Sequence, residues 1–278
     1  MREKLCKTFK YISGYVWDLL RDSQYYGFYQ TSLTNINRGL GLNEETISDL
    51  IFLKAIQRQP YDIISIKFGK NYEAQEGADW EWWFLSRSGI IGLRLQAKRI
   101  HINRGIIEYS HLDYQKQGNY QVDILLQQAQ SKGMGPLYIF YNWWDLNFPF
   151  RDYVNSIIPF CCKVYSSRNL GVTIASAIEV GKAVHSSKKS LSDILPISYP
   201  ISCLFCCQYS DLTKSLHVFL NRYITKQEID IKIYETLPED VYMRLKGEFD
   251  EKSPIYTVFI LDLEELHKDL DKIKEAMK

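Results

Sequence analysis

The stretch EGADWEWWFLSRSGIIGLRLQAKRIH, residues 76–101, predicts two strands joined by a tight turn. Residues 86–89 are typical turn formers, and Gly89 can adopt a positive φ without steric cost. Side chains on a strand point to opposite faces with period two, so each strand has one polar and one apolar stripe. The polar stripes contain Asp79, Glu81, Arg94, Gln96 and Lys98.

A symmetric turn predicts the pairing of the two strands. Asp79 then faces Gln96, and Glu81 faces Arg94, so an acidic stripe lies beside a Gln/Lys stripe. One interpretation is an ordinary hairpin with one wet face, in which Glu81 and Arg94 form a plain cross-strand ion pair. The other is a functional site, because a carboxylate, a carboxamide and a lysine converge within an aromatic strand.

Length and charge limit the classes of protein. The chain has 278 residues, near the size at which one hydrophobic core stops growing, so we expect a single domain. The formal net charge is +1, so a nucleic-acid site has to be a local basic patch. The chain starts with charged residues and has no apolar run of about 18 residues. We therefore expect a cytoplasmic protein without a membrane partner.

The positions of the cysteines in the sequence predict that they are free thiols. Two adjacent pairs, at 161–162 and 206–207, lie in apolar surroundings, which favours buried thiols over a disulfide framework. Cys203 and Cys206 have the spacing of half a zinc site, with His185 among the candidate partners. Because no second pair has this spacing, we expect no zinc.

The remaining pattern predicts an α/β chain. We expect helices over 4–21, over 43–58 with Asn43 as N-cap, and from a cap at Asn119 to Gly133. Residues 22–42 are expected to form a loop with at most a short helical turn. Strands are expected over 62–68 and 137–141, and the helix before 137 is long enough to cross over to a parallel strand. Two glutamates, Glu44 and Glu45, begin the second helix, where the macrodipole alone explains acidic residues.

This order of helix, three strands, helix and strand resembles the core of the PD-(D/E)XK nuclease superfamily, the restriction-endonuclease-like fold. The resemblance covers about residues 43–142. It implies a mixed central sheet flanked by helices, with an α-β-β-β-α-β core. Residues 143–278 are then a C-terminal extension of the same domain or a small accessory lobe. The stretches GADWEWW and LQAK also resemble an uncharacterised bacterial family within that superfamily.

The resemblance assigns residues to a metal-dependent site. Asp79 matches the first acid, Gln96-Ala97-Lys98 the acid-x-Lys motif, and Glu45 the helical glutamate, with Glu44 as its rival. Mg²⁺ or Mn²⁺ would be held by Asp79, Glu45 and Gln96, and Lys98 would orient the nucleophile or stabilise the transition state. The chain departs from the pattern at Gln96, where an acid is usual, although Gln-x-Lys variants occur among active members.

Other residues are candidates for binding nucleic acid. Arg99, His101 and Arg104 follow Lys98 and are predicted to contact phosphates; a solvated strand end is the alternative. Some nucleases of this fold place a glutamine near the site where Gln121 stands, but the pattern favours a solvated helix position. Trp143 and Trp144 suit base stacking, although packing within the protein is the favoured interpretation.

These observations predict a metal-dependent endonuclease acting on DNA, and the resemblance implies a role in bacterial restriction or anti-phage defence. The first alternative is an inactive nucleic-acid- or partner-binding module of the same fold. Another is a toxin-like effector that needs an activating protein partner, with residues 143–278 as the docking part. A homo-oligomer is also compatible with the sequence.

Overall fold

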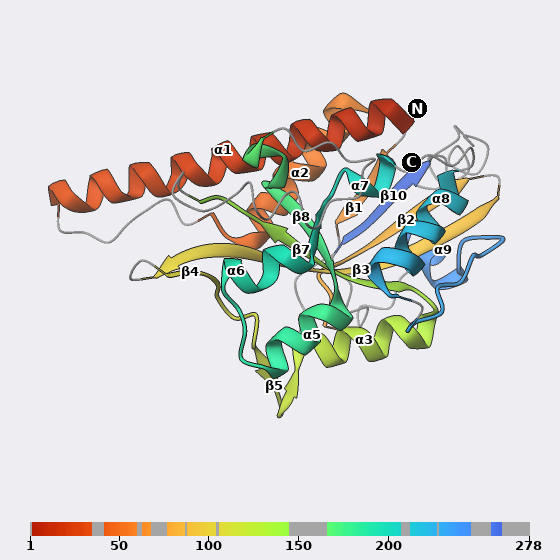
Figure 1. Cartoon of the computed structure of the whole chain (residues 1–278). Coiled ribbons are helices and arrows are strands. Elements are labelled where there is room, and N and C mark those ends of the chain that lie inside the picture. The colour runs from red at the N-terminus through yellow and green to blue at the C-terminus, as the bar shows by residue number, and fades with distance from the viewer. Residues whose placement is uncertain are drawn as a thin grey trace.

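The computed structural model describes residues 2–34, 42–59, 63–67, 77–86, 88–103, 106–144, 166–206, 212–226, 228–245 and 257–262. Within these ranges the chain forms a mixed α/β fold around one large sheet (Figure 1). Helices α1 (Arg2–Thr34) and α2 (Glu44–Arg58) cover one side of the sheet. Helices α3 (Gln121–Lys132) and α5 (Ala177–His185) lie on the opposite side. The predicted mixed sheet flanked by helices is therefore confirmed.

The sheet has eight strands among the described residues, in the order β1-β10-β2-β3-β7-β8-β9, with β4 paired to β3. Their bounds are β1 (Ile63–Lys67), β2 (Trp80–Ser86), β3 (Gly89–Asn103), β4 (Ile106–Tyr109), β7 (Gly135–Tyr141), β8 (Val172–Ser176), β9 (Ser198–Pro200) and β10 (Thr257–Asp262). A small second ladder joins β5 (Gln115–Lys116) and β6 (Asn119–Tyr120).

Shorter elements complete the described chain. They are the helices α6 (Leu191–Ile194), α7 (Cys203–Cys206), α8 (Leu212–Phe219) and α9 (Glu239–Leu245). Single turns of other helix types are η2 (Ser167–Leu170), η3 (Leu195–Ile197) and η4 (Leu220–Ile224).

The hairpin has the predicted register. Strand β2 pairs antiparallel with β3, with Glu81 opposite Arg94 and Trp82 opposite Leu93. Gly89 has a φ of +126°, and a Cβ there would collide with the side chain of Ile233. The turn therefore requires glycine at this position.

The crossover is also confirmed. After β3 and the small ladder, α3 leads to β7, which pairs parallel with β3. Strand β10, which comes from near the end of the chain, lies between β1 and β2 in the sheet. It is parallel to β2 and antiparallel to β1. It belongs to the part beyond residue 142, as do β8 and β9, so the extension contributes three strands to the same sheet.

Two predicted helix boundaries were wrong. Helix α1 continues to Thr34 rather than ending near residue 21. No proline interrupts residues 2–34, so nothing in the backbone forces the helix to stop. Helix α3 begins at Gln121 with Tyr120 before it, because Asn119 is taken up by the β5–β6 ladder. Its predicted end is right: Gly133 closes the helix with a φ of +66°.

Apolar side chains pack on both faces of the sheet. On the α1 and α2 side, Phe9, Trp82 and Phe84 are fully buried, and the Phe9 ring stacks on Phe205 at 4.5 Å between centroids. On the α3 and α5 side, Tyr138 and Phe140 pack under the two helices. None of the helices in the described ranges has both the length and the apolar character needed to cross a membrane.

A disulfide joins Cys6 on α1 to Cys206 on α7, and corrects the prediction that these cysteines are thiols. The two residues are 200 positions apart, so sequence spacing gave no sign of the pair, yet the packing of α1 on α7 brings their Cα atoms to 5.8 Å. Cys203 is a buried free thiol, as predicted. Cys161, Cys162 and Cys207 lie outside the described residues. Disulfides are rare in the reducing cytosol, so this bond and the predicted cytoplasmic location are in tension.

We expect this bond to stabilise the fold by restricting the unfolded chain. Cys6→Ala should lower the free energy of unfolding by up to about 5 kcal/mol under oxidising conditions. Urea unfolding with and without dithiothreitol measures this loss, with Cys203→Ala as the control that retains the bond. If dithiothreitol destabilises Cys6→Ala as much as the wild-type protein, the pairing is wrong.

Candidate active site

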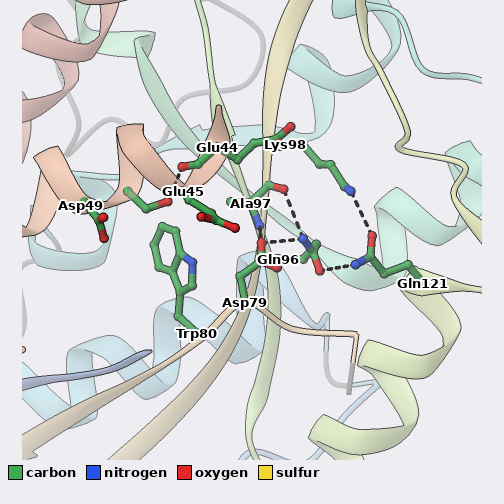
Figure 2. Close-up of a pocket in the computed structure, with 10 residues that line it drawn as sticks. Glu44, Glu45, Asp49, Asp79, Trp80, Gln96, Ala97, Lys98 and Gln121 are labelled. Carbon is green, nitrogen blue, oxygen red and sulfur yellow. Dashed lines mark hydrogen bonds between the residues drawn. The ribbon is translucent and has the colours of Figure 1, made fainter. Parts of the chain in front are cut away.

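A cavity of about 210 Å³ opens where the first turn of α2 meets the start of β2 and the middle of β3 (Figure 2). Ten residues line it, and they include all four residues predicted to be catalytic, Asp79, Gln96, Lys98 and Glu45. Glu44 and Gln121 line it too. The structure therefore brings together candidates that are distant in the sequence, from Glu44 on α2 to Gln121 on α3.

Helix α2 is fixed at the cavity by its cap and by one buried contact. Asn43 Oδ1 accepts a hydrogen bond of 2.8 Å from the backbone N–H of Thr46, as an N-cap does. One turn later, the hydroxyls of Ser48 and Tyr141 lie 2.9 Å apart in the interior, which ties α2 to strand β7. These contacts place both glutamates of the first turn at the mouth of the cavity.

Asp79 stands immediately before β2 and faces Gln96, as the register predicts. Its Oδ2 accepts a hydrogen bond of 2.5 Å from Gln96 Nε2 and one of 2.7 Å from the backbone N–H of Ala97. Both hydrogen bonds that Asp79 accepts from described residues go to this one oxygen. The carboxylate is thus held rigidly against β3.

Lys98 reaches the same site through Gln121. The lysine is 7% exposed, and its Nζ donates a hydrogen bond of 2.9 Å to Gln121 Oε1. Gln121 Nε2 in turn donates a hydrogen bond of 2.6 Å to Gln96 Oε1. The expectation that Gln121 is a solvated helix residue was therefore wrong: it is the first residue of α3, and the crossover points it at β3.

Burial sets the protonation of the two charged groups. Burial raises the pKa of Asp79 from 3.8 to about 6, although the charge of Lys98 and the hydrogen bonds from Ala97 and Gln96 act in the opposite direction. Burial also lowers the pKa of Lys98, and the charges of Asp79 and Glu44 oppose that effect. Perturbed pairs of this kind are concentrated in functional sites.

The three carboxylates of α2 that line the cavity differ in their contacts. Glu44 Oε1 accepts a hydrogen bond of 3.3 Å from the backbone N–H of Arg99, so it ties the helix to β3. The Glu45 side chain points into the cavity (Figure 2). Asp49, one helical turn further, also lines the cavity and was missed by the sequence analysis. Its spacing of four residues from Glu45 is the signal that could have found it.

The oxygen atoms around the cavity suit Mg²⁺ or Mn²⁺. Four carboxylates line it, from Glu44, Glu45, Asp49 and Asp79. Mg²⁺ prefers oxygen ligands and usually takes one or two carboxylates together with waters. In the described part of the chain, no group of three or more His, Cys, Asp or Glu residues is placed to hold a metal ion. If Mg²⁺ were to bind here, one or two of these carboxylates together with waters would hold it.

The two described residues that were predicted to contact phosphates, Arg99 and His101, do not line the cavity. Arg99 and His101 are half-buried and follow Lys98 on β3, and His101 lies opposite Glu108 of β4. Burial lowers the pKa of His101, as does the nearby charge of Arg99. Arg104 lies outside the described residues. The period of the strand puts Arg99 and His101 on the face opposite Lys98.

The two tryptophans and the histidine that were considered for base stacking and zinc binding contact other parts of the protein. Trp144 is 3% exposed and its ring meets that of Trp17 edge-on at 4.5 Å between centroids, so packing is confirmed for this residue. Trp143 is partly buried against the core. His185 contacts Asp123 at 3.0 Å rather than any described cysteine.

The raised pKa of Asp79 predicts a pH-dependent stability. A folded-state pKa above the ordinary value means that the folded protein binds this proton more tightly than the unfolded chain does. Wild-type stability should therefore fall as the pH rises from 3.8 to about 6. Asp79→Asn keeps an oxygen for the two hydrogen bonds and should lack this fall. Urea unfolding of both proteins across this range measures the difference, and identical profiles would contradict the assignment.

Comparison with known proteins places the chain in a family. No curated protein and no solved structure matches it significantly. One family model, described as "Family of unknown function (DUF6615)", matches residues 5–275. Because the match covers nearly the whole sequence, the chain belongs to the DUF6615 family.

Proposed function

We propose that this protein is a metal-dependent endonuclease that hydrolyses phosphodiester bonds in DNA, with a restriction-endonuclease-like core. The observation that carries the proposal is a single cavity lined by Asp79, Lys98 and the glutamates of α2. The sequence pattern alone predicts the same residues as a metal-dependent site. A role in bacterial restriction or anti-phage defence, and a cytoplasmic location, belong to the same proposal.

The chemistry follows from the charges around the cavity. Asp79 and Glu45, with Gln96 beside them, would hold Mg²⁺ or Mn²⁺. Such an ion, when bound, supplies positive charge against the phosphate and makes a water molecule more acidic. Four carboxylates face a single lysine in this cavity, so without a cation its charge repels a phosphodiester. The site therefore suits phosphate chemistry only when a cation is present.

Lys98 is the residue best placed to act on the reacting phosphate. Its ammonium group is buried and is held at 2.9 Å by the Gln121 oxygen, so its position is fixed before substrate binds. A fixed positive charge in a poorly solvated site stabilises the negative charge that develops on the phosphate. Lys98 would thus stabilise the transition state or orient the attacking water.

One observation favours the inactive binding module as a second candidate. Gln96 stands where an acid is usual, and it turns its amide nitrogen, not its oxygen, toward Asp79. A protein that had lost the metal would keep such a neutral contact. An activating protein partner or a second copy of the chain is compatible with either function.

A cleavage assay separates the two functions. Asp79→Asn and Lys98→Met should each lower the rate of plasmid nicking in Mg²⁺ or Mn²⁺ by about a hundredfold or more. Lys188→Met removes an exposed lysine outside the cavity and should leave the rate unchanged. Circular dichroism checks that every variant is folded. Full activity in either cavity variant would remove that residue from the site, and a wild-type protein without activity favours the binding module.

The two glutamates of α2 should differ in their effect on cleavage. Glu45→Gln should reduce nicking more than Glu44→Gln, because Glu45 points into the cavity whereas Glu44 bonds the backbone of Arg99. Glu44→Gln should instead lower thermal stability, since it weakens the tie between α2 and β3. Rates and melting temperatures of both variants decide the assignment. A dead Glu44→Gln beside an active Glu45→Gln reverses it.

A further inference from the structure

Four side chains form a continuous chain of hydrogen bonds around the cavity, which we call the amide relay (Figure 2). Lys98 Nζ donates to Gln121 Oε1 at 2.9 Å, and Gln121 Nε2 donates to Gln96 Oε1 at 2.6 Å. Gln96 Nε2 then donates to Asp79 Oδ2 at 2.5 Å. The relay thus links a buried ammonium group to a carboxylate through two neutral amides.

The two ends of the amide relay fix its direction. An ammonium group can only donate hydrogen bonds, and a carboxylate can only accept them. Each glutamine between them therefore has one orientation that satisfies both neighbours. Gln96 must turn its nitrogen toward Asp79, and the same nitrogen also lies 3.2 Å from the carbonyl oxygen of Ala97. The Gln96 oxygen consequently faces Gln121.

This direction opposes joint binding of a cation by Asp79 and Gln96. A cation between them needs an oxygen from each, but an amide hydrogen with partial positive charge already occupies that side of Asp79. Before Gln96 can offer its oxygen, the contact with Gln121 has to break as well. A glutamate at position 96 would behave differently, because it cannot donate to Asp79 and would leave two carboxylates facing each other.

We infer that the amide relay keeps the free protein a weak cation binder and makes cation binding depend on a phosphodiester ligand. A phosphate oxygen is a stronger acceptor for the Lys98 ammonium than the neutral oxygen of Gln121. When phosphate takes Lys98, Gln121 loses its donor and both glutamines can turn. The Asp79 carboxylate and the Gln96 oxygen then become available to a cation. This inference rests on the proposed function for the identity of the ligand.

Binding of Mn²⁺, followed by electron paramagnetic resonance of the free ion, tests the inference without a cleavage step. The phosphate probe is a DNA duplex with phosphorothioate linkages, which resist hydrolysis. The wild-type protein should bind Mn²⁺ weakly alone and at least about tenfold more tightly with the duplex. Gln96→Glu should bind Mn²⁺ alone at least about tenfold more tightly than the wild type, because a second carboxylate attracts the ion. Addition of the duplex should change the Mn²⁺ affinity of Gln96→Glu only slightly.

Two further variants control for charge and folding. Gln127→Glu adds the same charge to an exposed position on another face of α3 and should bind Mn²⁺ like the wild type. Gln121→Glu still accepts from Lys98 but cannot donate to the Gln96 oxygen, so the relay no longer fixes the Gln96 nitrogen on Asp79. It should therefore also bind Mn²⁺ more tightly without duplex, and it serves as the test if Gln96→Glu does not fold by circular dichroism.

The outcomes distinguish this inference from the proposed function. If the wild-type protein binds Mn²⁺ alone as tightly as Gln96→Glu does, or if Gln127→Glu matches Gln121→Glu, the inference fails while the nuclease proposal stands on the nicking assay. If the wild type and every variant bind no Mn²⁺ with or without duplex, the cavity holds no cation and both fail.

Discussion

The antiparallel register between β2 and β3 fixes where the polar groups of these two strands lie in the cavity. Glu81 and Arg94 are opposite each other, fully buried, and 3.8 Å apart between Oε1 and Nε. Trp83 Nε1 donates a further hydrogen bond of 3.3 Å to the other oxygen of Glu81. A shift of one residue would turn Glu81 to the face of Trp82 and leave a buried charge without its partner, which is far more costly than keeping the pair. The same register sets Asp79 against Gln96.

The hairpin also positions α3, which carries the remaining member of the site. The Nζ of Lys132, the last residue of this helix, lies 3.8 Å from Glu81 Oε1, the oxygen that also faces Arg94. Gln121, the first residue, bonds Gln96 and Lys98. The helix is therefore anchored at both ends to the polar stripe of the sheet. A change in the Glu81–Arg94 pair should consequently disturb the distant cavity through α3 as well as through the strands.

Features that depend on neighbouring residues were readable from the sequence, and features that depend on distant parts of the chain were not. The period of two and the glycine at 89 gave the hairpin, its polar face and the pairing of Glu81 with Arg94. The cap at Asn43 located the first turn of α2. By contrast, the insertion of β10 between β1 and β2, and the bond from Cys6 to Cys206, arise from packing of residues about 200 positions apart. Asp49 and Gln121 became part of the site only through the placement of their helices.

The hydrogen-bond partners of Gln96 show how well a neutral amide is accommodated at a position where the nuclease pattern usually has an acid. A glutamine is 3% exposed at this position, and a buried amide without partners costs about 1–3 kcal/mol. Gln96 escapes this cost because its nitrogen meets Asp79 and its oxygen meets Gln121. If a glutamine had replaced an acid by chance, nothing would require a donor to stand beside its oxygen as well as an acceptor beside its nitrogen. In this protein Gln121 supplies that donor and Asp79 supplies that acceptor. The full pairing of both ends indicates that position 96 and position 121 act together, so that the amide, rather than a carboxylate, is the group to which this cavity is fitted.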